Sequence, residues 1–308
     1  MKKLWGVLCL ISLSLFAFSF SGYSMTSNKY TDGCKLETNA VINFDGVTIT
    51  PVEWILKEDE EDDYAPTVGV RLMIENQSRY SVWSQAYYGH INNQMVDRST
   101  IDCSEKIKPG EKGELILRFE EYYLQKQRIE RISEISTSFF IDFTEESEDG
   151  TSNGKRIITD CVTIARGKEN GLKPFIGREV YQNETLSIQA SDVLREFPGA
   201  YTAGLHIQNR GESLLGLTVR TIDINGKLIE AGTNLDAKSW CYLVPGKSVD
   251  IYNLAFLKNS KKPLIPLAEI ATVTLEIKAD TYVWSQESER LEVVEEREPV
   301  RVTIDIKQ

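Results

Sequence analysis

Residues 69–78 read GVRLMIENQS, and residues 204–213 read GLHIQNRGES. In both stretches apolar side chains alternate with polar ones, and the alternation stops at an asparagine, Asn76 or Asn209. A period of two predicts a β-strand that has one face in the core and one face in water. The two asparagines are 133 residues apart, which indicates that one half of the chain repeats the other.

Three further stretches recur in the same order along the chain. They are HINNQMV (90–96) with DINGKLI (223–229), IKPGEKGELIL (107–117) with LVPGKSVDIYNL (243–254), and ISEISTSFFI (132–141) with LAEIATVTLEI (267–277). The spacing is 133 between Ile91 and Ile224 but 136 between Pro109 and Pro245, so three residues are inserted between these positions in the second half. This period predicts a duplicated domain, because solenoid repeats are only about 20–50 residues long.

Turn residues separate the short apolar runs. Asn-Gly at 225–226 favours a tight hairpin, and Pro-Gly at 109–110 and 245–246 favours a type II turn. We count about seven strands in each half, which is typical of an immunoglobulin-like sandwich. The strand pattern lapses at 122–132 and 264–270, where a helix is expected in each half. The predicted fold is all-β, with two tandem immunoglobulin-like β-sandwich domains related by internal duplication.

The chain begins with a pattern that predicts export. Lys2 and Lys3 precede an uncharged apolar stretch (4–20) and then small residues, which is the order found in a secretory signal. The alternative is an uncleaved N-terminal anchor, because the apolar stretch is nearly long enough to span a membrane. No second stretch of that length follows. We divide the chain into a signal peptide (1–24), a flexible lead (25–39), a first sandwich (40–166), a linker (167–174) and a second sandwich (175–308).

The quoted motifs resemble a known group of modules. IENQS, INNQMV, KPGEKGE and ISEISTSFFI are similar to exported β-sandwich modules of unknown function from Gram-positive, often anaerobic, bacteria. The resemblance covers each half, is clearer in the first, and implies an immunoglobulin-like fold and an extracellular or envelope location. It implies no catalytic residue. The chain departs from the lipid-anchored members, because no acceptable cysteine follows its signal.

The charge balance limits the partners. The formal net charge is −11, which disfavours nucleic acid and anionic lipid surfaces. We expect no nucleic acid partner and no membrane span after signal cleavage. An envelope protein or a cell-surface glycan stays open as the partner.

Four cysteines would remain after cleavage, and export permits disulfides. Cys103 and Cys161 share the first half and are the expected pair, whereas Cys34 and Cys241 have no evident partner. The alternative, in which all four are free, is left open. No two of them have the spacing of zinc ligands.

No recognisable catalytic constellation accompanies the two histidines, His90 and His206, and no GxSxG context is present. We therefore expect no enzyme, no catalytic residue, no cofactor and no metal site. The acidic run at 58–63 could hold calcium, but it lacks the spacing of a dedicated loop and favours a solvated loop.

The repeat predicts an aromatic strip on the outer face of one strand. In the second half the odd-numbered residues of 215–219 are apolar and should face the core. At the same spacing the even-numbered residues of 82–86 face the core, so Trp83, Gln85 and Tyr87 point outward. Such a strip stacks on sugars or anchors a protein. The alternative is that these rings pack under a loop or against the other domain.

The function predicted from the sequence is a non-catalytic binding module at the cell envelope, with a protein or glycan partner. Trp83, Gln85 and Tyr87 are its candidate ligand-binding residues. The alternative is an accessory or inhibitory domain pair for a separate secreted hydrolase.

Overall fold

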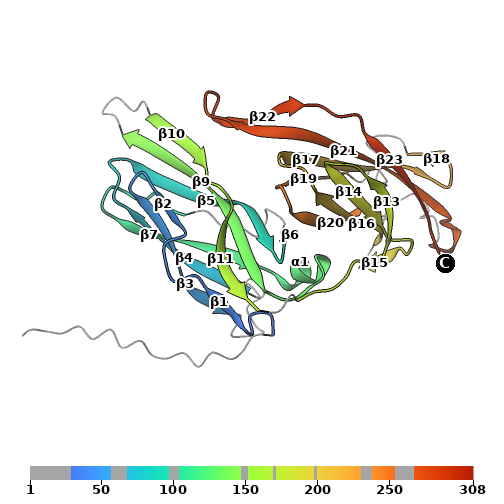
Figure 1. Ribbon diagram of the computed structural model, residues 1–308, viewed down its shortest axis with the longest axis horizontal. Helices are drawn as coiled ribbons and strands as arrows, with labels where there is room; N and C mark the ends of the chain where they lie inside the picture. Colours follow the sequence, from blue (N-terminus) through green and yellow to red (C-terminus); the bar gives the residue numbers. More distant parts are fainter. Residues whose placement is uncertain are drawn as a thin grey trace, which may run out of the picture.

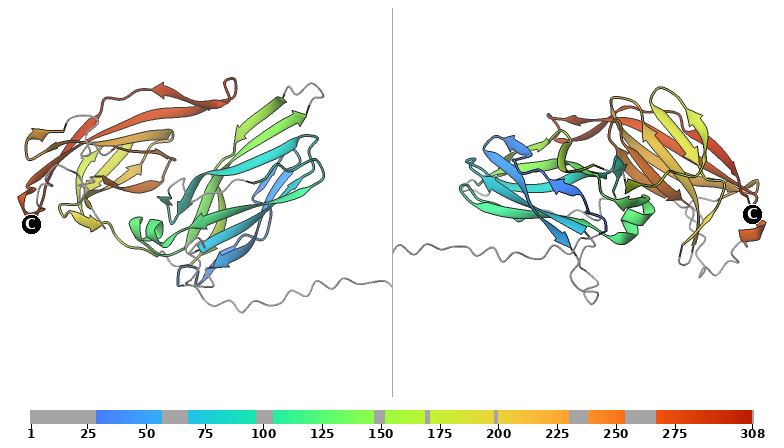
Figure 2. Two further views of the ribbon diagram at one scale, coloured as in Figure 1. Left: turned by 180° about the vertical axis from the view of Figure 1, so that it is seen from behind. Right: turned by 60° about the horizontal axis from the view of Figure 1, so that its bottom comes forward.

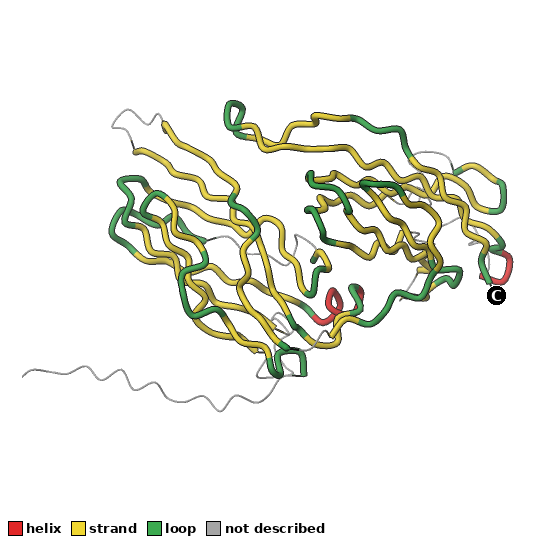
Figure 3. The backbone as a smooth tube through the Cα atoms, viewed as in Figure 1, coloured by secondary structure: helices red, strands yellow, loops and turns green. Residues whose placement is uncertain are grey.

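The computed structural model describes residues 29–56, 68–96, 104–146, 152–168, 171–197, 200–229, 238–253 and 267–307 (Figure 1). These residues form mostly β-strands, with one short α-helix, α1 (Glu121–Lys126), and one 3-10 helix, η2 (Leu267–Glu269) (Figure 3). The expected all-β class is confirmed. The signal segment, the acidic run at 58–63 and Cys103 lie outside the described residues.

The first half forms two sheets on either side of a common core. Its strands are β1 (Cys34–Leu36), β2 (Ile42–Phe44), β3 (Val47–Leu56), β4 (Val68–Asn76), β5 (Ser81–Ile91), β6 (Gln94–Met95), β7 (Lys112–Phe119), β8 (Ile129–Arg131), β9 (Glu134–Glu146), β10 (Ser152–Ile158) and β11 (Val162–Gly167). One sheet has the order β2-β3-β4-β7. The other runs β1-β11-β9-β5-β6, with β10 also paired to β9.

The second half is built in the same way. Its strands are β12 (Gly171–Leu172), β13 (Arg178–Gln182), β14 (Leu186–Ala190), β15 (Arg195–Phe197), β16 (Ala200–Asn209), β17 (Leu214–Ile224), β18 (Lys227–Leu228), β19 (Lys238–Leu243), β20 (Ser248–Asn253), β21 (Thr272–Ser285), β22 (Arg290–Glu295) and β23 (Val300–Asp305). One set of strands runs β13-β14-β16-β20. The other runs β18-β17-β21-β22, with β19 paired to β17 and β23 to β21.

The strand order therefore occurs twice. The order β2-β3-β4-β7 is matched by β13-β14-β16-β20, and β11-β9-β5 is matched by β23-β21-β17. The hairpin turns match as well: φ is 52° and 66° at Asn92 and Asn93, and 54° and 78° at Asn225 and Gly226. Positive φ at both central residues defines a type I′ turn, whose twist suits a two-residue hairpin. Asn92-Asn93 therefore forms the same turn as Asn-Gly at 225–226.

Alternation decides which side chains each strand buries. Val70, Leu72 and Ile74 on β4 are fully buried, as are Leu205 and Ile207 on β16. The β4 residues belong to one hydrophobic cluster and the β16 residues to another. Burying an aliphatic side chain of this size contributes about 1.5–3 kcal/mol. Each half therefore has a core of its own.

A helix is present in the described part of each of the two stretches where one was expected. α1 occupies the start of the stretch at 122–132, and β8 takes its end. The stretch at 264–270 contains η2. β8 pairs with β12, so the chain returns to strand geometry within three residues of the helix.

The expected flexible lead at 25–39 needs correction over its described part. β1 pairs with β11 from Cys34 to Leu36. Tyr30 is 3 % exposed and Cys34 is 7 % exposed, and both belong to the core of the first half. The backbone N–H of Ile132 donates to the carbonyl of Tyr30 at 2.6 Å. The segment is polar in composition and was therefore expected to be flexible, but a turn directs the side chains of Tyr30 and Cys34 into the core.

The two halves lie side by side with α1 near their junction (Figure 1, Figure 2). A single parallel bridge between Gln94 on β6 and Ser248 on β20 joins strands of both halves into one eleven-stranded sheet. Among the described residues, no helix has the length and apolar character needed to cross a membrane.

Candidate binding site between the two halves

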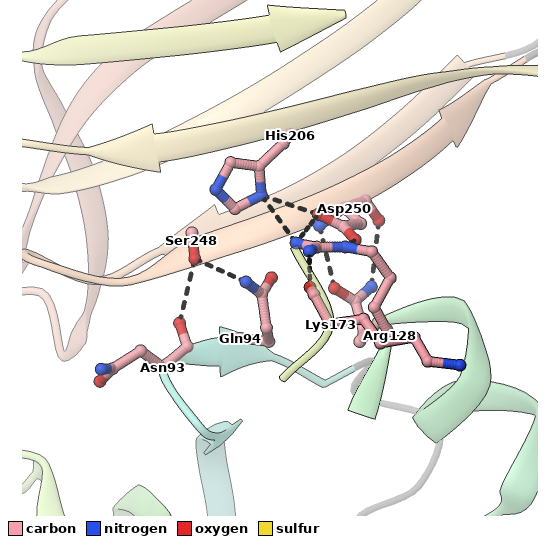
Figure 4. Close-up of polar contacts among 8 residues, drawn as sticks. Asn93, Gln94, Arg128, Lys173, His206, Ser248 and Asp250 are labelled. Carbon is pink, nitrogen blue, oxygen red and sulfur yellow. Dashed lines mark hydrogen bonds and ion pairs between the residues drawn. The ribbon is translucent and has the colours of Figure 1, made fainter. Parts of the chain in front are cut away.

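A fully buried carboxylate lies at the junction of the halves. The Asp250 side chain on β20 is 0 % exposed, and its Oδ1 lies 2.7 Å from Nδ1 of His206 on the neighbouring strand β16 (Figure 4). Arg128, which follows α1, donates from Nε to Oδ2 and from Nη2 to Oδ1, the latter over 3.1 Å. A buried charge needs such partners, because an uncompensated one costs several kcal/mol. This cluster connects α1 to the second half.

The segment between the halves is held on the same cluster. The ring of Phe175 stacks on the ring of His206 with centroids 5.6 Å apart. The guanidinium carbon of Arg128 lies 5.4 Å from the centroid of Phe175, and Nη1 donates to the carbonyl of Lys173. Arg128 therefore contacts both halves and their connection.

The side chain of Gln127 bonds the main chain of β20 at Asp250, as a neighbouring strand would. Its Nε2 donates to the carbonyl of Asp250 over 3.0 Å, and its Oε1 accepts the backbone N–H of Asp250 over 2.9 Å. These two bonds satisfy backbone groups of β20 that are buried at the junction, where an unsatisfied group would be costly.

A second polar cluster lies next to the parallel bridge. Nζ of Lys247 is 2.8 Å from Oδ1 of Asn93 and 3.3 Å from both the Glu134 carboxylate and Oγ of Ser136. The Lys247 side chain is only 15 % exposed. Gln94 donates to Oγ of Ser248 over 3.0 Å, which adds a side-chain bond to the bridge (Figure 4).

Aromatic rings also connect the halves. Trp83 and Tyr87 on β5 both contact Phe140 on β9, with centroids 5.6 Å and 6.1 Å apart. Phe140 in turn contacts Trp284 on β21 of the second half at 6.0 Å. The Trp83–Phe140 and Phe140–Trp284 pairs are edge-to-face, and such pairs add about 0.5–1.5 kcal/mol to the burial of the rings.

A second set of contacting aromatic rings connects the halves through Tyr88. Its ring lies 4.6 Å from Tyr87 and 5.9 Å from Tyr242 on β19. Tyr242 also contacts Trp240 at 4.5 Å and Tyr282 at 5.2 Å. The contact between Tyr88 and Tyr242 joins the first half directly to the second.

A cavity of about 370 Å³ lies beside this second set of rings and is lined by both Tyr88 and Tyr242. Its walls come from β5, β6 and α1 of the first half and from β19 and β20 of the second. Its charged and polar lining residues include Lys126, Gln127, Ser239 and Asp250, and ligand pockets of about 300–1,000 Å³ typically combine apolar and aromatic walls with a few polar groups. Its aromatic lining residues are Tyr87, Tyr88, Tyr123, Trp240, Tyr242 and Tyr252.

The structure places the predicted strip on the outer face of β5. Val82, Ser84 and Ala86 are fully buried, whereas Trp83, Gln85 and Tyr87 are partly buried on the other face. That face is turned toward the second half, because Trp83 and Tyr87 pack on Phe140, which contacts Trp284 of the second half. Of the three residues, Tyr87 lines the cavity.

The sequence interpretation missed the residues that the second half contributes to the cavity. On β19, Leu243 is fully buried and Trp240 is 50 % exposed, so the alternation used for β5 would have marked Trp240 and Tyr242 as a second outward strip. Tyr123 on α1 carried no such signal. Which outward strips face each other depends on the junction of the halves, which the repeat does not encode.

Burial shifts the pKa values of two thiols and one imidazole. It raises the pKa of Cys34 to about 11 and also raises the pKa of Cys161. Burial, together with the charge of Lys247, lowers the pKa of His90 to about 3. Cys161 carries a free thiol and Cys103 lies outside the described residues, so the Cys103–Cys161 disulfide stays a prediction. In the described part of the chain, no three His, Cys, Asp or Glu side chains converge as a metal site would require.

No family model matches the chain, and no curated protein matches it. Among solved structures, the crystal structure of red sea bream transglutaminase is similar at a TM-score of 0.22 and 11 % sequence identity. The match covers 90 % of this chain and 31 % of that chain, so this chain spans less than a third of that protein.

The expectation that the chain is not an enzyme is corrected by this comparison. The similar solved structure is that of a transglutaminase, and the expectation is not maintained. At this TM-score the likeness carries no argument for an activity either.

Proposed function

We propose that the protein is an exported binding protein made of two immunoglobulin-like domains, and that a cell-surface glycan binds in the cavity between them. The aromatic lining of that cavity is the observation that carries the proposal. Residues 1–24 act as the secretory signal, and the protein works at the cell envelope.

The repeated strand order supports the domain assignment. Each half has two sets of strands around its own hydrophobic cluster, and the two sets recur in the same order. Two antiparallel sheets packed around one core are the architecture of an immunoglobulin-like sandwich. The resemblance of IENQS and KPGEKGE to exported sandwich modules agrees with this assignment.

The shape and chemistry of the cavity favour a sugar. Trp240 and the tyrosines that line the cavity present flat apolar faces with polar edges, which suit a ring that is apolar on its faces and carries hydroxyls around its rim. A volume of about 370 Å³ suits a small ligand, whereas a protein partner needs a broad surface.

The test is titration of the protein with soluble glycan fragments prepared from isolated cell envelopes, followed by tryptophan fluorescence. We expect saturable binding that Trp240→Ala weakens about tenfold, equivalent to about 1.4 kcal/mol. Phe44→Ala is the matched control, because Phe44 is an exposed ring outside the cavity and should leave binding unchanged.

The contrary outcome is also defined. Fluorescence that does not respond to any fragment, together with a saturable protein captured by cross-linking on cells, would replace the glycan with a protein partner.

A further inference from the structure

We infer that the ligand of the cavity is an acidic sugar whose carboxylate is bound by Lys126. This inference rests on the proposed function, because it names the class of glycan that the same cavity takes. Lys126 is the last residue of α1 and forms part of the cavity wall.

The ammonium group of Lys126 has no counter-ion in the described part of the chain. Its side chain is partly buried at the wall, and it makes no ion pair or hydrogen bond with a described residue. The other lysines at the junction differ: Lys247 contacts Glu134, and Lys173 pairs with Glu130. A partly desolvated cation gains from an opposite charge that a ligand brings.

The carboxylate in the cavity wall does not neutralise Lys126. Asp250 is the acidic residue among the lining residues, and both of its oxygens are bound by Arg128, with His206 next to Oδ1. The charges of Asp250 and Arg128 compensate each other, so the wall keeps the single positive charge of Lys126. Because the chain has a net charge of −11, the charge of this cavity wall is opposite in sign to that of the whole chain.

One lysine matches one negative charge. A phosphate carries up to two charges and is typically held by several cationic or backbone donors, whereas a carboxylate carries one charge and can be held by one ammonium group. The other lining residues include the aromatic rings together with Met95, Val249 and Ile251, which provide the stacking surface for the sugar ring. Gln127 and Ser239 add polar groups to the wall. A hexuronic acid unit combines a sugar ring with one carboxylate.

The experiment compares galacturonic acid with its methyl ester, which has the same ring but no charge. We measure the affinity of both probes for the purified protein by calorimetry. The acid should bind about tenfold more tightly than the ester, and added salt should reduce the difference, as expected for one charge-assisted contact.

Variants distinguish the contribution of Lys126 to the affinity from that of the protein's net charge. Lys126→Gln should remove the preference for the acid and leave binding of the ester unchanged, and Lys126→Arg should keep part of the preference. Lys227→Gln is the matched control, because Lys227 is an exposed lysine on β18 outside the cavity, and it should change neither affinity.

Two failures are distinguishable. Equal binding of acid and ester, with Trp240→Ala still weakening both, would overturn the role of Lys126 and retain a glycan cavity. Binding of neither probe, with no response to Trp240→Ala for any envelope glycan fragment, would overturn the proposed function and this inference together.

Discussion

Asn76 and Asn209 make the same hydrogen bonds at the same point of the two halves. Each ends a buried strand, is itself fully buried, and donates from Nδ2 to two main-chain carbonyls. The carbonyls belong to Tyr80 (2.7 Å) and Ile107 (2.9 Å) in the first half, and to Ser213 (2.8 Å) and Leu243 (2.9 Å) in the second.

The spacing of these partners follows the sequence repeat. Tyr80 and Ser213 are 133 residues apart, whereas Ile107 and Leu243 are 136 apart, which is the change of spacing read from the sequence. The main-chain carbonyls of the two asparagines also accept matching bonds, from Gly110 (2.7 Å) and Gly246 (3.0 Å). The repeat therefore extends to individual hydrogen bonds.

Substituting either asparagine should destabilise its half strongly. Asn76→Ala and Asn209→Ala each remove two side-chain hydrogen bonds to main-chain carbonyls and the Oδ1 acceptor of a turn N–H, and each such bond contributes about 0.5–1.5 kcal/mol. We expect the free energy of unfolding to fall by about 2–4 kcal/mol in either variant, measured by urea denaturation. Asn43→Ala, at an exposed position of β2, should change it by less than about 0.5 kcal/mol. Equal losses in all three variants would contradict this role.

The fold of each half could be predicted because local rules decide it. Alternation fixed the inward set of β4 and β5, and the Asn-Gly turn at 225–226 identified its partner at Asn92-Asn93. The junction could not be predicted in the same way. Arg128 and Asp250 are 122 residues apart and lie in segments that the repeat treats as independent, so nothing in the periodicity brings them together. The cavity depends on that junction, and only Tyr87 of the predicted strip lines it.

Removing Arg128 should weaken the junction more than removing an exposed ion pair. Arg128→Ala leaves the Asp250 carboxylate buried with His206 as its remaining side-chain partner. Breaking a buried pair in this way costs about 3–5 kcal/mol. We expect a loss in this range by urea denaturation, together with an increased radius of gyration in small-angle X-ray scattering.

Arg156→Ala is the matched control for this loss. Arg156 also links the halves, since its Nε lies 3.9 Å from Oε2 of Glu289, but its side chain is half exposed. Exposed pairs contribute at most about 1 kcal/mol. An Arg156→Ala loss as large as that of Arg128→Ala would show that the junction does not depend on the buried cluster.

His90 should make the protein less stable as the pH falls. Burial holds its pKa at about 3, below the ordinary value of 6.5, so the folded chain keeps the ring neutral where the unfolded chain protonates it. The free energy of unfolding should therefore be insensitive to this group above pH 6.5. Below that pH it should decline, by at most about 1.4 kcal/mol per pH unit.

The His90→Leu variant tests this assignment. Neither ring nitrogen of His90 has a partner at hydrogen-bond geometry, so an apolar side chain should be tolerated at pH 8 and should flatten the decline between pH 6.5 and 5. His206→Gln keeps His90 in place and should retain the decline that His90 causes. A slope in His90→Leu equal to that of the original protein would assign the pH dependence to other groups.

Thiol reactivity tests the packing of the segment before the first sandwich. With a pKa of about 11 and a 7 % exposed side chain, Cys34 should be present as thiolate at only about 0.1 % near pH 8, and the thiolate is the reacting form. Alkylation by iodoacetamide followed by peptide mapping should show Cys34 reacting about a hundredfold more slowly in the folded protein than in urea. Cys161 should also react more slowly when folded, because burial raises its pKa. Mapping without reductant would detect the Cys103–Cys161 bridge if it forms.

Equal rates for Cys34 in the folded and unfolded protein would mean that β1 does not pack on β11 in solution, and residues 29–36 would then be the flexible lead expected from their composition.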